Sequence, residues 1–317
     1  MTPPATPSSG PDRPATHSPA TPRRATHRLT LPSRRGAPAR ELVLGPRTLV
    51  MGIVNVTPDS FSDGGRDAEA ATAHALRLVD EGADLLDVGG ESTRPGAAEV
   101  PAEEQERRVI PVIERLAAAC PGVPLSIDTR SAAVARAAVA AGASIVNDVS
   151  GLAHDLAMRG TIASLGVPAV VMHMRGSPAD MRERATYGDV VEDVLAELRV
   201  LLQAAREAGC RQLLADPGLG FAKTAEQSAS LLAATPRFAE LGVPVLVGSS
   251  RKRFLSLAAP DREGEPVSET RRAASIAAAA LAAYLGAHVV RVHDVAACAQ
   301  AVRLADLLAA PRPSTST

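Results

Sequence analysis

The sequence contains few aromatic residues: it has no Trp, two Tyr and four Phe among 317 residues. Its core must therefore be built from Ala, Val, Leu and Ile, and a hydrophobic content of 46% is enough for a packed globular domain. The three cysteines, Cys120, Cys210 and Cys298, lie far apart without metal-site spacing, so we expect reduced core residues. A net charge of -1 argues against a nucleic-acid partner held by general electrostatic attraction.

Long apolar runs and nucleotide-binding glycine motifs are also missing. No apolar run approaches the roughly 20 residues that span a membrane, so we expect no membrane partner and a cytoplasmic location. Neither Gly-x-Gly-x-x-Gly nor the Walker A pattern occurs. Their absence disfavours a reaction that uses a nicotinamide dinucleotide or a P-loop nucleotide.

Residues 1–40 are rich in Pro, Ser, Thr and Arg and contain one acidic residue, Asp12. Such a segment buries too little apolar surface to offset the entropy of the free chain. Its Arg and Ser content faintly suggests a transit peptide, but the prolines disfavour the amphipathic helix that such peptides form. We therefore expect a disordered tail at 1–40 without a targeting role, one folded domain at 41–312 and a short tail at 313–317.

From residue 48 onward, short apolar segments alternate with amphipathic helical patterns. Strands are expected at 48–54, 84–88, 124–127, 144–147, 168–172, 212–215, 244–247 and 288–292. Helices are expected at 68–81, 102–119, 132–141, 155–165, 190–208, 225–234, 268–285 and 295–308. Repeated helix–Gly–strand junctions indicate a parallel sheet. Eight such units predict a single-domain α/β protein with a (β/α)8 TIM barrel, and an open doubly wound sheet is the alternative fold.

Polar side chains follow every expected strand, where a barrel places its active site. A flat heterocycle with an amino-amide edge could be hydrogen-bonded by a set of four such residues: Asp128, Asn147, Asp216 and Lys252. Arg291 could stack on that ring or bind an anion. The first and last strands become neighbours when a barrel closes. Asn55, Arg291 and His293 therefore predict a phosphate site.

These segments together resemble the signature motifs of the dihydropteroate synthases, a family of pterin-binding enzymes. The motifs lie at 55–65, 89–96, 127–129, 147–151, 216–223, 248–252 and 291–294, and the resemblance spans residues 48–308. It implies a (β/α)8 barrel, a homodimer and Mg²⁺. It also implies condensation of 6-hydroxymethyl-7,8-dihydropterin pyrophosphate with 4-aminobenzoate, which gives 7,8-dihydropteroate and pyrophosphate in folate biosynthesis.

The resemblance also implies a role for each matching residue. The implied pterin-binding residues are Asp128, Asn147, Met172, Asp216, Phe221, Lys252 and Arg291. The implied pyrophosphate site comprises Asn55, Thr93, Arg291 and His293, with Asn55 also a ligand of Mg²⁺. The implied 4-aminobenzoate site comprises Pro95, Phe221 and Ser250. The implied catalytic residues are Asp59, Arg94, Asp216 and Lys252, with mobile loops at 55–65 and 89–97.

A dissociative substitution is the expected mechanism, because the pterin ring can delocalise positive charge as pyrophosphate leaves. In this hypothesis Arg291 and His293 neutralise the leaving group, and the loops exclude water. Two other functions remain open. A methyltetrahydrofolate-dependent methyltransferase would share the barrel but would have little use for the 55–65 loop. A catalytically inactive pterin-binding paralogue with a regulatory or structural role would be expected to carry damaged loops or a damaged anion site.

Overall fold

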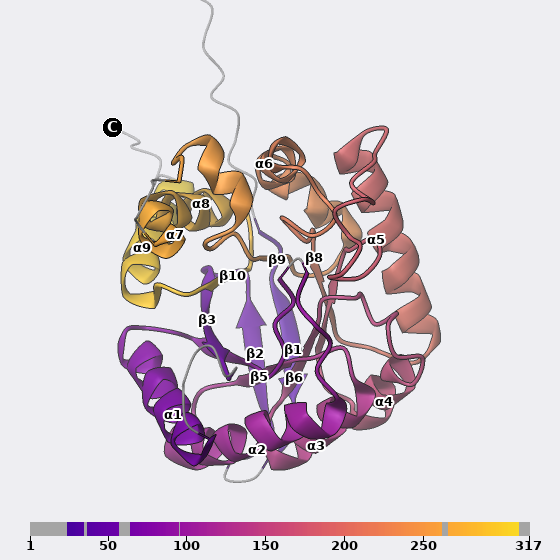
Figure 1. Cartoon of the computed structure of the whole chain (residues 1–317), viewed down its shortest axis with the longest axis vertical. Helices are drawn as coiled ribbons and strands as arrows, with labels where there is room; N and C mark the ends of the chain where they lie inside the picture. Colours follow the sequence, from indigo (N-terminus) through magenta and orange to yellow (C-terminus); the bar gives the residue numbers. More distant parts are fainter. Residues whose placement is uncertain (1–23, 35–36, 57–63, 95, 262–265, 311–317) are drawn as a thin grey trace, which may run out of the picture.

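A ring of parallel strands surrounded by helices forms the centre of the molecule (Figure 1). The computed structural model describes residues 24–34, 37–56, 64–94, 96–261 and 266–310. The barrel strands are β3 (Leu49–Asn55), β4 (Leu85–Gly89), β5 (Leu125–Asp128), β6 (Ile145–Asp148), β7 (Ala169–Met172), β8 (Leu213–Asp216), β9 (Leu246–Val247) and β10 (Val289–Val292). All the strands expected from the sequence are present.

The ring closes at two places. β10 pairs with β3 over four residue pairs, so the first and last barrel strands are neighbours. β8 and the segment before β9 are joined by a parallel bridge between Ala215 and Val245, and the Ala215 N–H donates to the Pro244 carbonyl at 2.9 Å. The predicted TIM barrel is therefore confirmed, and the open doubly wound sheet is wrong.

The helices of the ring are α1 (Gly64–Asp80), α2 (Ala102–Ala119), α3 (Ala132–Ala141), α4 (Met158–Leu165), α5 (Val190–Glu207), α6 (Ala225–Ala233), α7 (Val267–Thr270), α8 (Arg272–Tyr284) and α9 (Val295–Ala309). Short 3-10 helices lie at η1 (Thr235–Leu241) and η2 (Arg253–Leu257). Local signals set several boundaries: Ser131 caps α3, and Gly142 ends it with φ +131°. The helix expected at 268–285 is instead divided at Arg271, whose buried side chain bonds to Asp261.

An antiparallel hairpin of β1 (His27–Leu31) and β2 (Arg40–Leu44) precedes the barrel. The tail expected at 1–40 is therefore wrong for residues 24–34 and 37–40, whereas residues 1–23 and 311–317 lie outside the described part. The composition of the segment as a whole hid a local alternation in which Leu29 and Leu31 are buried. These leucines pack with apolar residues inside the barrel, such as Met51 and Leu85, so the hairpin covers its amino end.

Side chains inside the barrel change from apolar to polar along β4, β6, β8 and β10. The interior cluster next to the hairpin contains only apolar residues, from Leu49 to Val289. Two residues further along their strands, the polar residues Asp87, Asn147, Asp216 and Arg291 occupy the inward positions, because strand side chains alternate with a period of two. Within the described ranges, no helix is both long and apolar enough to cross a membrane.

Candidate active site

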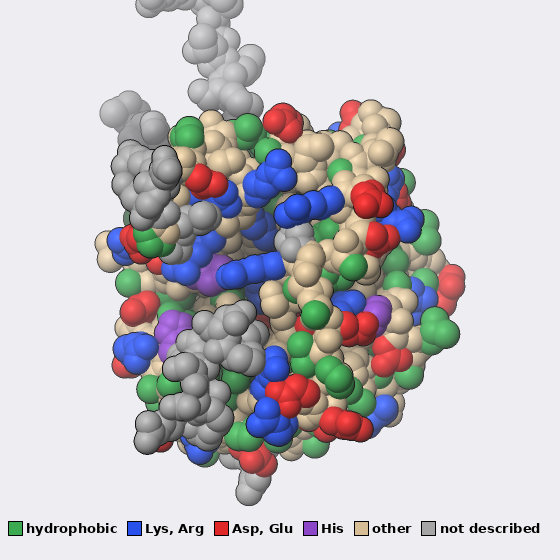
Figure 2. Space-filling view, in the orientation of Figure 1, with side chains coloured by type: hydrophobic (Ala, Val, Ile, Leu, Met, Phe, Trp, Pro, Cys, Tyr) green, Lys and Arg blue, Asp and Glu red, His purple; other side chains and the backbone are tan. Residues whose placement is uncertain are grey.

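The carboxyl ends of the barrel strands bring the predicted polar residues to one face. Strand register explains this grouping: Asn55 lies beside Gly89, Gly89 beside Asp128, and Asp128 beside Asn147 in successive strands. Figure 2 shows Lys and Arg side chains around a hollow in the middle of this face, with a His side chain within it. A cavity of about 520 Å³ lies at the opposite end, next to the hairpin, where Arg47 and Asp84 pair with each other. The chemistry therefore places the site at the polar end.

Arg291 is held by two carboxylates at the centre of this face. Its Nε lies 2.6 Å from Asp87 Oδ2, and its Nη2 lies 2.7 Å from Asp128 Oδ2. Asn147 Nδ2 donates to the same Asp87 oxygen at 2.9 Å. Within the described part of the chain, the second oxygens of Asp87 and Asp128 are buried without a hydrogen-bond partner. These two acceptors are therefore available to N–H donors of a bound molecule.

Asp216 and Lys252 form the other side of the site. Asp216 Oδ1 accepts a hydrogen bond from the Gly218 N–H at 2.7 Å. The Lys252 ammonium lies 4.7 Å from the centroid of the Phe221 ring, a cation–π arrangement. A Cβ placed on Gly248 would lie 3.6 Å from Lys252 Nζ and 4.0 Å from Asp216 Oδ2, so Gly248 lies next to both charged groups.

Burial shifts the pKa values of these groups toward neutrality. It raises the pKa of Asp128 to about 7, although the Arg291 guanidinium opposes the shift. It also raises the pKa of Asp216, here against the opposing charge of Lys252. The pKa of Lys252 falls to about 8 through burial, again against the attraction of Asp216. The site thus holds two groups, Asp128 and Lys252, whose pKa values lie near neutral pH, as is frequent in active sites.

His293 lies at the predicted anion site beside Ser250. The His293 Nδ1 is 3.0 Å from Ser250 Oγ, and its backbone N–H donates to the same oxygen at 3.3 Å. We assign the hydroxyl as the donor to Nδ1, which leaves the ring proton of the neutral imidazole on Nε2. Burial, together with the charges of Arg251, Arg291 and Arg94, lowers the pKa of His293 to about 3. His293 is consequently neutral at pH 7.

A family model described as "Pterin binding enzyme" matches residues 51–293. The chain belongs to this family. A dihydropteroate synthase from Mycobacterium leprae is 47% identical over 262 residues, which cover 80% of this chain and 91% of that protein.

Solved structures give the same result. The Xanthomonas albilineans dihydropteroate synthase with 4-aminobenzoic acid matches with a TM-score of 0.81 and 49% identity, covering 91% of this chain and 100% of that one. A structure of the synthase from the same organism in complex with 7,8-dihydropteroate matches with a TM-score of 0.77 and 47% identity, covering 90% and 100%. The activity of this member of the pterin binding enzyme family is that of a dihydropteroate synthase, a transferase of folate biosynthesis.

The structure of this family member brings most of the predicted site residues to one face. Asp128, Asn147 and Arg291 share one network, and Asp216, Phe221 and Lys252 lie together. Met172 ends β7 and pairs in register with Asp216. Asn55 ends β3, while Thr93 and Arg94 lie in the loop after β4. Asp59 and Pro95 lie outside the described residues. The roles of all these residues stay predictions.

Asp87 was not identified from the sequence, although its side chain joins Asn147 to Arg291. It lies in the expected strand 84–88, two residues after the inward-facing Leu85, and therefore faces inward as well. A carboxylate within an apolar strand is itself a signal, because Asp is almost never fully buried unless it is paired. Asp87 thus bonds to Asn147 and Arg291, both of which are predicted to contact the pterin ring.

A partly buried lysine next to the site was also missed. Lys223 Nζ lies 2.9 Å from His173 Nδ1 and donates to the Phe221 carbonyl at 2.9 Å, while His173 Nε2 lies 2.9 Å from Glu197 Oε2. Burial lowers the pKa of Lys223 to about 7 and that of His173 to about 4. The pattern Phe-Ala-Lys places Lys223 two residues after the expected pocket residue Phe221, but no sequence spacing indicates that His173 faces it.

Proposed function

We propose that the polar end of this barrel carries out the dihydropteroate synthase reaction with the residue roles given below. The observation that supports this assignment is the pair of buried carboxylates, Asp87 and Asp128, that hold Arg291 while each keeps one oxygen without a partner. A site that only stabilised the barrel would need neither the free acceptors nor the neighbouring Asp216 and Lys252.

The pterin ring binds deepest, against the inward-facing polar residues. The free carboxylate oxygens of Asp87 and Asp128 accept hydrogen bonds from the amino-amide edge of the ring. Asn147 is fixed by Asp87, so its amide oxygen is oriented for a donor. Asp216 and Lys252 bind the opposite edge, and Met172 and Phe221 contact the ring faces. Negative charge from Asp216 favours the electron-poor ring that forms as the leaving group departs.

Pyrophosphate departs toward Arg291, Thr93 and Arg94. The carbon–oxygen bond to pyrophosphate breaks first, and the positive charge left on the methylene carbon is delocalised into the ring. Because His293 is neutral, it donates a hydrogen bond from Nε2 to a pyrophosphate oxygen and contributes no positive charge. The cationic part of the anion site therefore falls to the arginines.

Asn55 is the expected protein ligand of Mg²⁺. The described residues contain no group of three or more His, Cys, Asp or Glu side chains that could hold a metal ion. A single amide oxygen at the end of β3 fits an ion that is held mainly by substrate phosphates, which is a common arrangement for Mg²⁺. Bound there, Mg²⁺ would neutralise part of the pyrophosphate charge.

4-Aminobenzoate binds last, between Phe221, Ser250 and the proposed contact Pro95. Its aromatic amine attacks the methylene carbon, and the released pyrophosphate is available to take up the amine proton. Asp59 and Arg94 belong to loops that close over this position and exclude water from the cation. The hydrogen bond to His293 fixes the rotamer of the Ser250 side chain.

A homodimer formed through α8 and α9 accompanies this function. These two helices pack against each other and expose Leu281, Tyr284, Leu304, Leu307 and Leu308, with Leu307 74% exposed. Large apolar side chains exposed on two neighbouring helices favour a protein interface there. Leu307→Glu is expected to convert dimer to monomer in light scattering. The proposed location of the enzyme is the cytoplasm, and no nucleic-acid or membrane partner is proposed.

The decisive experiment measures pyrophosphate release and dihydropteroate formation by the purified protein. Dihydropterin pyrophosphate and Mg²⁺ are supplied with and without 4-aminobenzoate, and Arg291→Met serves as the inactive control. The synthase makes dihydropteroate only when both substrates are present. Pterin binding without product would support the inactive paralogue, for which the family comparisons offer no support.

A further inference from the structure

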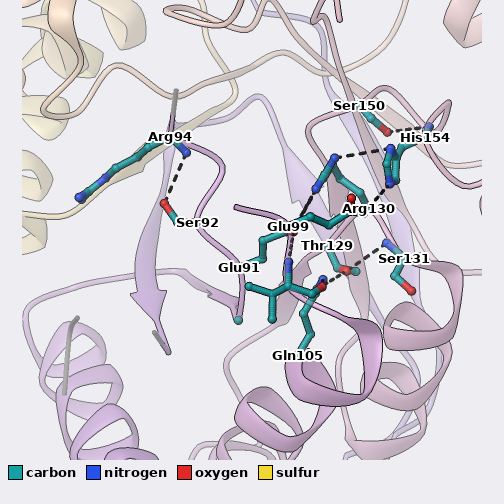
Figure 3. A network of polar contacts seen from close by, with 12 residues as sticks. Glu91, Ser92, Arg94, Glu99, Gln105, Thr129, Arg130, Ser131, Ser150 and His154 are labelled. Carbon is teal, nitrogen blue, oxygen red and sulfur yellow. Dashed lines mark hydrogen bonds and ion pairs between the residues drawn. The ribbon is translucent and has the colours of Figure 1, made fainter. Parts of the chain in front are cut away.

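The loop after β4, here called the 91–100 loop, is attached at both ends. It carries Thr93 and Arg94, and the structure describes all of it except residue 95. At its start, Glu91 Oε1 accepts a hydrogen bond from the Val100 N–H at the loop's end, at 3.0 Å (Figure 3). The two ends of the loop are thus joined by one buried carboxylate.

That carboxylate is paired with Arg130. Arg130 Nη2 lies 3.0 Å from both Glu91 oxygens, and its Nε lies 3.2 Å from Oε2. The two side chains are only 7% and 3% exposed. Arg130 follows Asp128 by two residues at the end of β5, so this pair links the 91–100 loop to the strand that carries a proposed pterin contact.

A second chain of hydrogen bonds joins the same two segments. Gln105 Nε2 donates to the Val100 carbonyl at 2.8 Å, and Thr129 Oγ1 donates to Gln105 Oε1 at 3.0 Å. The Ser131 N–H in turn donates to Thr129 Oγ1 at 3.1 Å. Figure 3 shows these residues converging below Arg130, whereas the Arg94 side chain extends away from them.

An outer contact completes the network on the solvent side. His154 Nδ1 lies 3.5 Å from Arg130 Nη1, and His154 Nε2 lies 3.2 Å from Glu99 Oε1. His154 and Glu99 are both exposed, so this contact is weaker than the buried pair. The tip of the loop is held differently, by backbone hydrogen bonds from the Gly96 N–H to the Pro178 carbonyl and from the Ala97 N–H to the Arg94 carbonyl.

We propose that Glu91 and Arg130 are positioning residues, which fix both ends of the 91–100 loop relative to Asp128. With both ends fixed, Thr93 and Arg94 are held at a set position relative to the pyrophosphate. The proposal rests on the proposed function, which assigns these two residues to the pyrophosphate. A buried ion pair stabilises a fold little more than apolar side chains of the same size would. We therefore look for its role in the geometry of the loop and not in the stability of the protein.

Glu91→Gln tests the proposal, since it keeps an oxygen for Val100 while removing the charge that holds Arg130. The matched control is Asp306→Asn at the amino end of the barrel, where Asp306 pairs with Arg24 at 2.5 Å with side chains 15% and 9% exposed. We expect Glu91→Gln to reduce kcat/KM for dihydropterin pyrophosphate on the order of 10- to 100-fold, as a displacement of catalytic groups by about 1 Å does. Its affinity for 6-hydroxymethyl-7,8-dihydropterin, which lacks the pyrophosphate, should stay within about twofold. Hydrogen exchange of residues 92–99 should be faster than in the unmodified protein.

Several results would overturn the proposal. Equal losses of Tm in the two variants with unchanged kcat/KM would show that Glu91 is only structural. A parallel loss of affinity for the pyrophosphate-free pterin would show that the pocket, and not the loop, had changed. Should Glu91→Gln not fold, the exposed His154→Ala must show a smaller kinetic effect in the same direction, and no effect would count against the proposal. Failure of the proposed function is separate, because the unmodified protein would then make no dihydropteroate.

Discussion

Replacing Asp87 by Asn separates the charge of this residue from its shape. Asp87 and Asp128 hold the same guanidinium, at 2.6 and 2.7 Å from Arg291 Nε and Nη2. The Asn side chain still offers one oxygen to Arg291 or Asn147, but the negative charge next to Asp128 disappears. We expect the pKa of Asp128 to fall, because the charge of Asp87 contributes to raising it.

The size of the shift follows from the geometry. Two carboxylates on one guanidinium are separated by roughly 5 Å, and at an effective dielectric constant near 20 their repulsion is about 3 kcal/mol. That energy corresponds to about 2 pK units, so a shift of 1–2 units remains after partial relaxation. Below its pKa, Asp128 is protonated and has lost its charge. The acid limb of the kcat/KM profile should therefore move from about pH 7 to about pH 5–6.

The assay is kcat/KM for dihydropteroate formation between pH 5 and 9, with Asp84→Asn as the control. Asp84 lies at the other end of the barrel, where it pairs with Arg47, so its replacement should leave the acid limb in place. An acid limb that stays at the same pH in Asp87→Asn would refute the coupling between the two carboxylates.

The free energy of unfolding should also depend on the protonation of Asp128, but it should fall with rising pH where kcat/KM increases. Because the pKa of Asp128 is raised in the fold, its contribution to stability is present below the unfolded value near 3.8 and is lost as pH rises through about 7. In Asp87→Asn that loss should be completed at lower pH. Urea denaturation of the two proteins at pH 5 and pH 7 measures the difference.

Three further predictions follow from the site. The pKa of Lys252, lowered to about 8, predicts a fall of kcat/KM above pH 8 as the ammonium is lost; Lys252→Arg should be slower but lack this limb, and a limb that persists would assign it elsewhere. Gly218→Ala should cost about 2–5 kcal/mol in urea denaturation, because φ is +67° and the added Cβ would lie 2.0 Å from a carbonyl oxygen. The control Gly242→Ala, with φ +68° and open space, should cost about 1–2 kcal/mol, and equal costs would contradict the clash. Lys223→Met should raise KM for 4-aminobenzoate several-fold, because the Phe221 carbonyl loses its donor; an unchanged KM would make Lys223 structural.

The barrel could be read from the sequence because its signal is repeated and local. Each strand is short and apolar, and several helices carry their own capping signals, as Ser131 and Gly142 show for α3. The hairpin was missed because its few buried residues, such as Leu29 and Leu31, lie among prolines and arginines that dominate the composition. The strand was indicated by apolar residues at every second position, and not by the average composition of the segment.

The site could be predicted as a set of residues but not as a network. Residues after strand ends can be collected from sequence order alone, since a barrel brings these ends together. The partners that fix them come from distant segments: Asp87 and Arg291 are 204 residues apart, and Lys223 and His173 are 50 apart. The neutral state of His293 was likewise missed, because it depends on burial and on arginines from other loops.

The weakest joint of the barrel runs through its active site. β9 has two residues, and one bridge with one hydrogen bond joins its edge to β8, whereas β10 and β3 share four residue pairs. Asp216 ends β8 on one side of this seam, and Lys252 follows β9 on the other. If a pterin binds both residues as proposed, it links the two sides of this joint and adds its binding energy where the sheet has the fewest hydrogen bonds. We therefore expect substrate binding to stabilise the barrel most at the joint between β8 and β9.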